Sequence, residues 1–402
     1  MPPAGKRWSE RYTMQLELIA TSPMGLEAVV ARELKDLGYT DVKTENGRVT
    51  FKGGLEDIAR ANLWLRTSDR VLVKMAEFRA MTFEELFEGV RALDWPDWIP
   101  EDGEFPVNGR SQKSQLSSVP ACQSIVKKAV VERMKEQYGT EWFREDGARY
   151  VIEVSLLNDM ALITLDTTGP SLHKRGYRKL VTEAPIKETM AAAMVLLSRW
   201  SPERPLYDPF CGSGTIPIEA AMIGWNVAPG LRRSFSSDAW DIMGQSRWDL
   251  AREEAFDSVR DDVKLEIAGS DIDPEAIEVA EAALKKAGFA REIKLQTMPI
   301  ARVQPQGHYG CIITNPPYGE RLGTEKEADK VIRQLGFIDA VKKDWSVFAL
   351  SPSKSFEQSY GRNADKKRKL YNGRIECQLY QYLGPLPPRP RLDGAPTASS
   401  AE

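Results

Sequence analysis

The stretch "LYDPFCGSGTIPIEAAMIG", residues 206–224, decides the fold of the C-terminal half of the chain. A short apolar segment leads into a turn that contains Gly212 and Gly214, and an apolar run of helical length follows. Glycine lets a backbone turn tightly and approach a ligand without interference from a Cβ atom. No Gly-Lys-Ser/Thr follows, which excludes a triphosphate-binding loop, and the third glycine of a dinucleotide fingerprint is missing. We therefore predict a strand, a ligand-binding turn and a helix.

The segment "LEIAGSDIDPEAI" (265–277) places Asp271 at the end of the next predicted strand. An acidic side chain there can accept both ribose hydroxyls of an adenosine. In a plain dinucleotide-binding unit the acid follows the glycines by about 20 residues. The longer separation here indicates an insertion, in which we expect Trp240 and Trp248 to pack rather than to stack on a ligand. An acidic residue that binds a ribose, without a loop that binds phosphates, suits S-adenosylmethionine. Asp208 is expected to face the amino group of this cofactor or to hold the turn.

The stretch "ITNPPYGERL" (313–322) ends a further apolar strand. The exocyclic amine of a base is a poor nucleophile because its lone pair is delocalised into the ring. Two acceptors, the side-chain oxygen of Asn315 and the carbonyl of Pro316, can bind its N–H groups and free that pair, while Tyr318 can stack on the base. The two prolines make the loop rigid, so the acceptors are preorganised. Because such a pocket admits a single base, the target must be unpaired or flipped.

The overall composition limits the other classes of function. The 402 residues carry a net charge of −3, so a nucleic-acid partner must be bound by local patches rather than by a global basic field. We expect no membrane span and no signal peptide. The four cysteines are far apart and there are two histidines, which predicts a reducing cytoplasm and no metal site. Cys211 lies in the glycine turn, but no nearby histidine activates it, and Cys311 is expected in the core.

The pattern of elements changes along the chain. Up to about residue 168 the sequence predicts α+β units with hairpins at Asn46-Gly47 and Asn158-Asp159. From residue 186, strand, turn and helix repeat in that order, which predicts a parallel sheet. We expect disorder in residues 1–11 and in a Pro/Ser/Ala-rich tail, residues 386–402.

Two basic stretches lie on either side of the NPPY loop (315–318) in the sequence: "HKRGYR" (173–178) and "GRNADKKRKLYNGR" (361–374). Basic side chains interleaved with aromatic rings are typical of contacts to single-stranded or looped RNA. The residues predicted to bind RNA are Lys174, Arg175, Tyr177, Arg178, Lys366, Lys367, Arg368 and Lys369.

These stretches, together with "EAPIKETMAAAM" (183–194) and "DPFCGSGTIPIEAAMI" (208–223), resemble the bacterial THUMP-domain 23S ribosomal RNA guanine-N2 methyltransferases. The resemblance implies an α/β Rossmann-like methyltransferase domain at 169–385. It implies that a ferredoxin-like segment at 12–67 and a THUMP RNA-binding domain at 68–168 precede it. The substrate would be 23S rRNA or an assembling large ribosomal subunit. The residues that the resemblance assigns to the cofactor are Pro185, Asp208, Phe210, Gly212, Gly214, Thr215, Asp271, Ile272 and Met298.

Several alternatives stay open at this point. Many methyltransferases have an acid near the adenine after the third strand, whereas this chain has Thr297 and Met298 in "KLQTMPI" (294–300). The adenine is then held by backbone and by Met298. The NPPY motif does not separate adenine N6 from guanine N2, nor an rRNA from a tRNA substrate. A non-catalytic RNA-binding or ribosome-assembly factor is the alternative outside the enzymes, and cofactor binding would separate the two.

Overall fold

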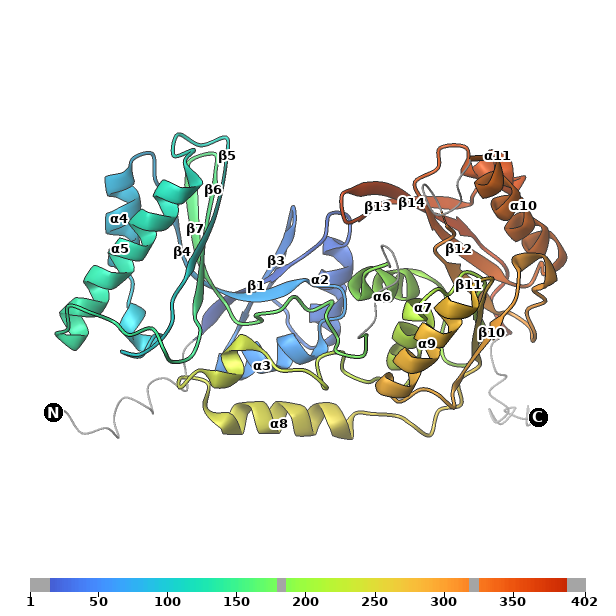
Figure 1. Ribbon diagram of the computed structural model, residues 1–402, viewed down its shortest axis with the longest axis horizontal. Helices are drawn as coiled ribbons and strands as arrows, with labels where there is room; N and C mark the ends of the chain where they lie inside the picture. The colour runs from blue at the N-terminus through green and yellow to red at the C-terminus, as the bar shows by residue number, and fades with distance from the viewer. Residues whose placement is uncertain (1–14, 179–185, 318–324, 389–402) are drawn as a thin grey trace, which may run out of the picture.

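Two seven-stranded sheets form the framework of the computed structural model, which describes residues 15–178, 186–317 and 325–388 (Figure 1). The first sheet belongs to the N-terminal 168 residues and the second to the C-terminal half. The expected disordered segments, residues 1–11 and nearly all of 386–402, lie outside the described residues. Among the described residues, no helix is both long and apolar enough to cross a bilayer.

The first sheet has the order β2-β3-β1-β4-β7-β6-β5. Its central strand β4 pairs with β1 through residues 70–73 and with β7 through residues 72–79. One strand therefore belongs to both N-terminal units, the expected ferredoxin-like segment and the expected THUMP domain. The expected boundary between them, at residues 67 and 68, falls just before this strand. The strands are β1 (Leu16–Thr21), β2 (Val42–Glu45), β3 (Arg48–Gly53), β4 (Arg70–Arg79), β5 (Val107–Gln112), β6 (Val151–Leu157) and β7 (Met160–Asp166).

Both predicted hairpins are confirmed. Asn46-Gly47 joins β2 to β3, with φ of +74° at Gly47, and Asn158-Asp159 joins β6 to β7 with φ of +52° and +63°. These left-handed conformations suit the tight turns that match the twist of paired strands. The helices that accompany this sheet are α2 (Glu27–Asp36), α3 (Leu55–Trp64), α4 (Phe83–Arg91), η1 (Trp95–Asp97) and α5 (Val119–Tyr138).

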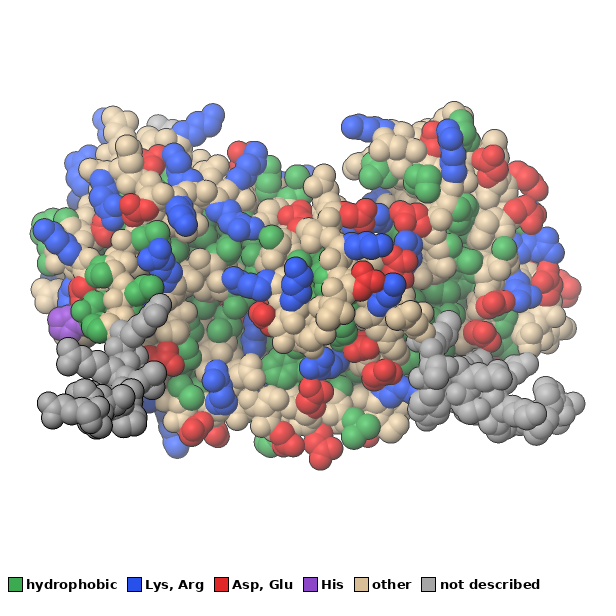
Figure 2. All heavy atoms as spheres, turned by 180° about the vertical axis from the view of Figure 1, so that it is seen from behind, with side chains coloured by type: hydrophobic (Ala, Val, Ile, Leu, Met, Phe, Trp, Pro, Cys, Tyr) green, Lys and Arg blue, Asp and Glu red, His purple; other side chains and the backbone are tan. Residues whose placement is uncertain are grey.

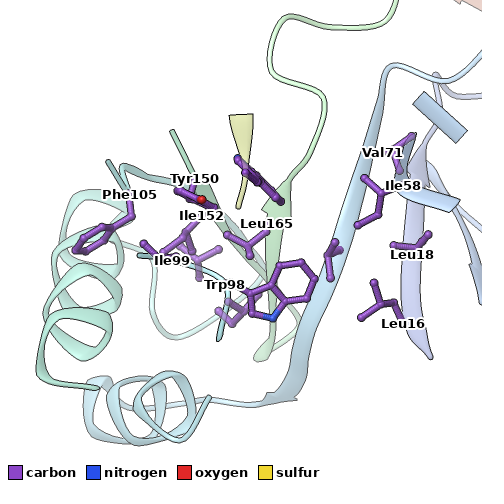
Figure 3. Packing of buried hydrophobic residues seen from close by; sticks show 14 of the residues in the cluster. Leu16, Leu18, Ile58, Val71, Trp98, Ile99, Phe105, Tyr150, Ile152 and Leu165 are labelled. Atoms are coloured by element: carbon purple, nitrogen blue, oxygen red, sulfur yellow. The ribbon is translucent and has the colours of Figure 1, made fainter. Parts of the chain in front are cut away.

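One hydrophobic core runs through both N-terminal units, from Leu18 of β1 and Val71 of β4 to Tyr150 and Leu165 beyond β4 (Figure 3). The insertion completes this core. Its elements are η2 (Ser236–Ala239) and α8 (Gly244–Asp257), and α8 lies below α3 in Figure 1. Trp240 stacks on Tyr150 at 4.8 Å between ring centroids, and Trp240 and Trp248 are each 1% exposed. The expectation that both tryptophans pack is confirmed, and the insertion fastens the C-terminal half to the N-terminal units.

The second sheet has the order β10-β9-β8-β11-β12-β14-β13, and the first five of these strands are parallel, as predicted. The chain runs outward from β8 through β9 to β10 and then returns to the other side of β8. Ligands bind at such a reversal, beyond the carboxyl ends of the strands. The strands are β8 (Leu206–Asp208), β9 (Ile267–Asp271), β10 (Ile293–Thr297), β11 (Cys311–Thr314), β12 (Ser346–Ser351), β13 (Lys366–Asn372) and β14 (Ile375–Tyr382).

Helices cover both faces of the second sheet (Figure 1). The α6 and α7 helices are mostly apolar, each with a single charged residue, Glu188 or Glu219, and nearly all of their residues are buried. This burial follows from their place between the second sheet and the N-terminal units (Figure 1). The elements are α6 (Glu188–Leu197), α7 (Thr215–Gly224), α9 (Pro274–Ala287), η3 (Ile300–Arg302), α10 (Glu325–Val341) and α11 (Phe356–Tyr360).

Candidate active site

The glycine turn lies at the reversal point of the sheet, between β8 and α7. Gly212 and Gly214 have φ of +49° and +76°, values that residues other than glycine rarely adopt. A Cβ atom on Gly214 would stand 3.2 Å from Ala280 and Leu284, whereas one on Gly212 would meet no atom within 4 Å. Gly214 is therefore needed for close packing of α7 on α9, and Gly212 faces open space where a ligand can approach.

Asp271 holds this turn from the end of the neighbouring strand β9. Its Oδ2 accepts a hydrogen bond from the Gly212 N–H at 2.9 Å, and its Oδ1 accepts one from the Asp273 N–H at 3.1 Å. The Met298 N–H donates to the Asp271 carbonyl at 2.7 Å, so the end of β10 is fixed to the same point. Ile272 is 72% exposed beside it, an apolar surface suited to one face of an adenine.

Asp208 ends strand β8 and is 1% exposed. Its Oδ1 accepts hydrogen bonds from the Thr314 hydroxyl at 2.6 Å and from the Phe210 N–H at 3.1 Å. Burial raises the pKa of Asp208 to about 7, and the nearby Asp271 carboxylate acts in the same direction. A cationic ligand group beside Asp208 would relieve this unfavourable burial of charge.

Asn315 follows directly on Thr314 at the end of β11. Its side chain is buried, 8% exposed, and its Oδ1 has no hydrogen-bond partner among the described residues. Pro316 is buried and Pro317 half-buried. An unsatisfied buried carbonyl is costly unless a ligand supplies a donor, so Asn315 is suited to bind an N–H group. Tyr318 and Pro185, also predicted for the site, lie outside the described residues.

Thr215 begins α7 and is 2% exposed. Its hydroxyl accepts a hydrogen bond from Arg178 at 2.8 Å, and the same guanidinium nitrogen donates to the Ile186 carbonyl at 3.1 Å and pairs with Glu188 at 3.3 Å. Arg178 therefore joins the glycine turn to the start of α6. This geometry does not support the prediction that Arg178 binds RNA, because Nη2 makes all three contacts inside the methyltransferase domain and Nε is buried, without a partner among the described residues.

The other residues of "HKRGYR" also require correction. Arg175 and Tyr177 are 3% and 6% exposed, and both contact Glu219 of α7, with Arg175 Nε at 3.3 Å and the Tyr177 hydroxyl at 3.0 Å. A buried side chain with satisfied donors is not available to RNA, so the prediction fails for both. Lys174 alone of the four predicted there is exposed.

The second basic stretch forms strand β13. Lys366, Lys367 and Lys369 are exposed, although Lys367 pairs with Glu357 at 2.8 Å and Lys369 with Glu376 at 2.7 Å. Arg368 is half-buried and donates to the Gly25 carbonyl at 2.7 Å, which fixes the β13–β14 hairpin to the ferredoxin-like unit. Its role is in the first place an interdomain contact.

Other chemistries find little support in this region. Cys211 is 5% exposed, and burial raises the pKa of its thiol well above the usual value. Burial also raises the pKa of Cys311 to about 11. A thiol in such surroundings is a poor nucleophile. Within the described ranges, no group of three or more His, Cys, Asp or Glu side chains is placed to hold a metal ion.

Sequence reasoning missed Thr314, which links Asp208 to Asn315, and Glu219, the buried partner of Arg175. Glu219 did carry a signal, because it is the single charged residue of the apolar segment "TIPIEAAMIG" (215–224). A lone acid in an apolar helix indicates a buried ion pair.

Family models match three consecutive parts of the chain. Residues 17–72 match the RlmL ferredoxin-like domain, residues 80–166 the THUMP domain, and residues 175–381 the RMKL-like methyltransferase domain. The chain belongs to the RMKL-like methyltransferase family. The expected fold and domain types are thereby confirmed, whereas the exact domain boundaries stay predictions.

Two relatives illustrate the range of this family. YpsC of Bacillus subtilis, named as a candidate RNA methyltransferase, is 50% identical over 94% of this chain and 98% of its own length. The ribosomal RNA large subunit methyltransferase K/L of Shewanella frigidimarina is 34% identical over 90% of this chain and 52% of its own length. The chain therefore spans about half of the K/L relative.

Two solved structures share the whole architecture. A protein described as a predicted N6-adenine-specific DNA methylase, from Listeria monocytogenes, is 49% identical with a TM-score of 0.90, over 94% of this chain and 98% of its own. The methyltransferase candidate SMU.472 is 46% identical with a TM-score of 0.88, over 92% of this chain and 98% of its own, and its crystal structure contains SAH.

Proposed function

We propose that this RMKL-like methyltransferase transfers a methyl group from S-adenosylmethionine to the exocyclic N2 amine of a guanine in large-subunit ribosomal RNA. The observation that carries the proposal is the buried, unpartnered Oδ1 of Asn315 at the end of β11. A carbonyl oxygen so placed needs an N–H donor, and the amine of an unpaired base supplies one. The Pro316 carbonyl is proposed to accept the second N–H.

The cofactor would be bound at the ends of β8, β9 and β10. Asp271 is proposed to accept from the ribose hydroxyls, Ile272 and Met298 to enclose the adenine, and Asp208 to face the cationic end. The bound cofactor supplies an electrophilic methyl on a sulfonium. Transfer would break the S–CH3 bond of the sulfonium and form the new C–N bond, which would leave S-adenosylhomocysteine, and the amine would lose one proton to solvent. The acceptors at Asn315 and Pro316 localise the amine lone pair before that step and hold the base against rotation.

Two further observations support RNA, and ribosomal RNA in particular. A THUMP domain precedes the methyltransferase domain. The K/L relative is named a ribosomal RNA large subunit methyltransferase. Naked 23S rRNA and an assembling large subunit are both candidate substrates. Adenine-N6 methylation is the second candidate, because the Listeria protein carries that description and an adenine also offers an exocyclic amine.

Product analysis tests the proposal. The protein is incubated with transcribed 23S rRNA or with large-subunit particles and methyl-labelled S-adenosylmethionine, and the RNA is digested to nucleosides. We expect labelled N2-methylguanosine. Labelled N6-methyladenosine would replace guanine by adenine as the target. Absence of label in both RNA samples, with normal cofactor binding by calorimetry, would overturn the proposal in favour of a non-catalytic RNA-binding protein.

A further inference from the structure

A cavity of about 210 Å³ lies where the ferredoxin-like unit, helix α6 and the β13–β14 hairpin meet. Its lining includes Met24 and Asp69 from the first of these, Thr189 of the second with Lys187 just before it, and Tyr371 and Asn372 from the third. In Figure 1 the tip of the hairpin reaches toward α2, and the Arg368 contact with Gly25 holds it there. The cavity is therefore built by three parts of the chain that are far apart in sequence.

Two polar atoms in this lining are buried and have no partner among the described residues: Asp69 Oδ1 and Thr189 Oγ1. Thr189 is fully buried, 0% exposed, in the first turn of α6. Burial raises the pKa of Asp69, although Lys187, Arg70 and Arg175 act against that rise. Buried polar groups in native proteins are nearly always hydrogen-bonded, so two unpartnered oxygens on residues that line one cavity are candidates for bonds to a polar ligand.

The surroundings favour a nucleotide as that ligand. Lys187 is exposed at the cavity and can approach a phosphate. Tyr371 offers an aromatic ring, with the Lys369 ammonium 5.5 Å from its centroid. Strand β13 carries the exposed Lys366, Lys367 and Lys369 and ends at the cavity with Tyr371 and Asn372. A row of lysines that leads to an aromatic ring, beside the unpartnered Asp69 Oδ1, matches the way proteins bind single-stranded RNA.

The cavity is connected to the proposed cofactor site through the residues before and at the start of α6. The residues at the start of α6 contribute Lys187 and Thr189 to it, and Arg178 joins Ile186, the preceding residue, to Thr215 of the glycine turn. Figure 2 shows a hollow in the outline between two lobes, and in Figure 1 the tip of the β13–β14 hairpin, which lines the cavity, lies between the lobe of β5–β7 and the lobe of α10 and α11. An RNA strand in that hollow can reach both places.

We propose that this cavity is a second base-binding subsite, which holds an unpaired nucleotide of the substrate RNA near the methylated one. An N–H of its base donates to Asp69, the Thr189 hydroxyl bonds a second polar atom of the nucleotide, and Tyr371 contacts the base. This inference rests on the proposed RNA methyltransferase function and adds a determinant of sequence context to it. The methylated nucleotide is then selected partly by its neighbour, and not by the NPPY loop alone.

Asp69→Asn and Thr189→Val test the subsite, with Asp36→Asn as a matched control on the exposed end of α2. Each test variant changes a side chain whose buried polar atom has no partner in the described part of the free protein. We therefore expect an unfolding temperature equal to or above that of the wild type, and unchanged SAH binding. Affinity for transcribed 23S rRNA should fall about tenfold, the loss expected for one base-specific contact. A merely structural role would lower the unfolding temperature and leave RNA affinity unchanged.

A photo-crosslinker at the mouth of the cavity maps the nucleotide. p-Benzoylphenylalanine in place of Met24, which is 59% exposed, should crosslink within a few nucleotides of the methylated base. RNA affinity within twofold of wild type for both variants, or a crosslink remote from the methylated base, would overturn the subsite. Activity of the wild-type protein separates the subsite from the proposed function. If the wild type methylates RNA while these results are negative, only the subsite is wrong. If the wild type methylates no RNA, the proposed function is wrong as well.

Discussion

The Thr314 hydroxyl donates a hydrogen bond of 2.6 Å to the Asp208 carboxylate, between residues that are 106 positions apart in the chain. Asp208 ends β8 and precedes the glycine turn, whereas Thr314 ends β11 and precedes Asn315. This bond therefore joins the strand that leads to the proposed cofactor site to the strand that carries the proposed amine acceptor. Because this hydrogen bond is buried, a change in the protonation of Asp208 should affect both the proposed cofactor site and the proposed amine acceptor.

Cofactor binding should depend on pH through Asp208. The raised pKa of about 7 means that the carboxyl is largely protonated below pH 6 and largely ionised above pH 8. A cationic ligand group favours the ionised form, so we expect affinity for S-adenosylmethionine to rise between these values, with release of a proton on binding. Calorimetry in two buffers of different ionisation enthalpy measures that proton. Asp208→Asn should bind more weakly and without this pH dependence.

The free energy of unfolding should depend on pH in the opposite direction to cofactor affinity. Between the ordinary pKa near 3.8 and the raised one, the folded protein binds more protons at Asp208 than the unfolded chain does, so this residue lowers the free energy of unfolding as pH rises through that window.

Thr314→Val removes the hydrogen bond that lowers the pKa of Asp208, so the pH midpoint of cofactor binding should move to higher pH. Thr314→Ser keeps the hydroxyl and serves as the control. An unchanged midpoint in Thr314→Val would show that Asp208 does not govern binding.

Asn315→Ala should abolish methyl transfer without loss of cofactor binding. The Asn315 Oδ1 has no partner among the described residues of the free protein, so its removal costs no hydrogen bond there, and the free energy of unfolding should change little. Removal of one preorganised polar group that acts on the reacting centre typically lowers kcat by about 100-fold or more. Single-turnover transfer to RNA and SAH calorimetry measure the two effects. Full transfer activity in this variant would contradict the proposed role.

Strand β13 should contribute to RNA affinity through charge alone. Lys366→Gln with Lys367→Gln removes two exposed cations, so we expect weaker binding of all RNA sequences alike. The slope of log affinity against log salt should become shallower by about 0.7 to 0.9 for each phosphate that the protein no longer neutralises. Filter binding over a salt series measures it. Lys264→Gln, a change of an 84% exposed side chain just before β9, is the matched control and should leave the slope unchanged.

The parts of the site that could be predicted from the sequence are those that local residues determine. The glycine turn and the acid at Asp271 follow from short patterns, because backbone conformation and strand ends are local properties. The bond from Thr314 to Asp208 joins two strands that are adjacent in space only, and no short pattern contains both. The sequence also predicted a parallel sheet, but not that the insertion would pack on the N-terminal core through Trp240.

The basic stretch "HKRGYR" shows why charge is an ambiguous signal. Arginine next to tyrosine is typical of an RNA-binding surface, yet here Arg175 and Tyr177 converge on Glu219 in the interior. A charge on the surface and a charge in a buried pair look the same in sequence unless the partner is recognised. The partner lies 44 residues on, in an apolar helix. Tertiary pairing therefore decides which of the two roles a basic residue has.

Arg175→Met should accordingly destabilise the protein rather than weaken its binding of RNA. The guanidinium also donates to the carbonyls of Leu172 and Arg66, at 2.7 and 2.5 Å, and its removal leaves the Glu219 carboxylate buried beside the Tyr177 hydroxyl, which donates to it at 3.0 Å. Breaking one side of a buried ion pair costs about 3 to 5 kcal/mol, whereas replacing both sides by apolar groups costs much less. The free energy of unfolding in urea should therefore fall more in Arg175→Met than in the double variant Arg175→Met with Glu219→Leu. RNA affinity per folded molecule should match the wild type in both, and a selective loss of RNA binding at full stability would restore Arg175 to the RNA surface.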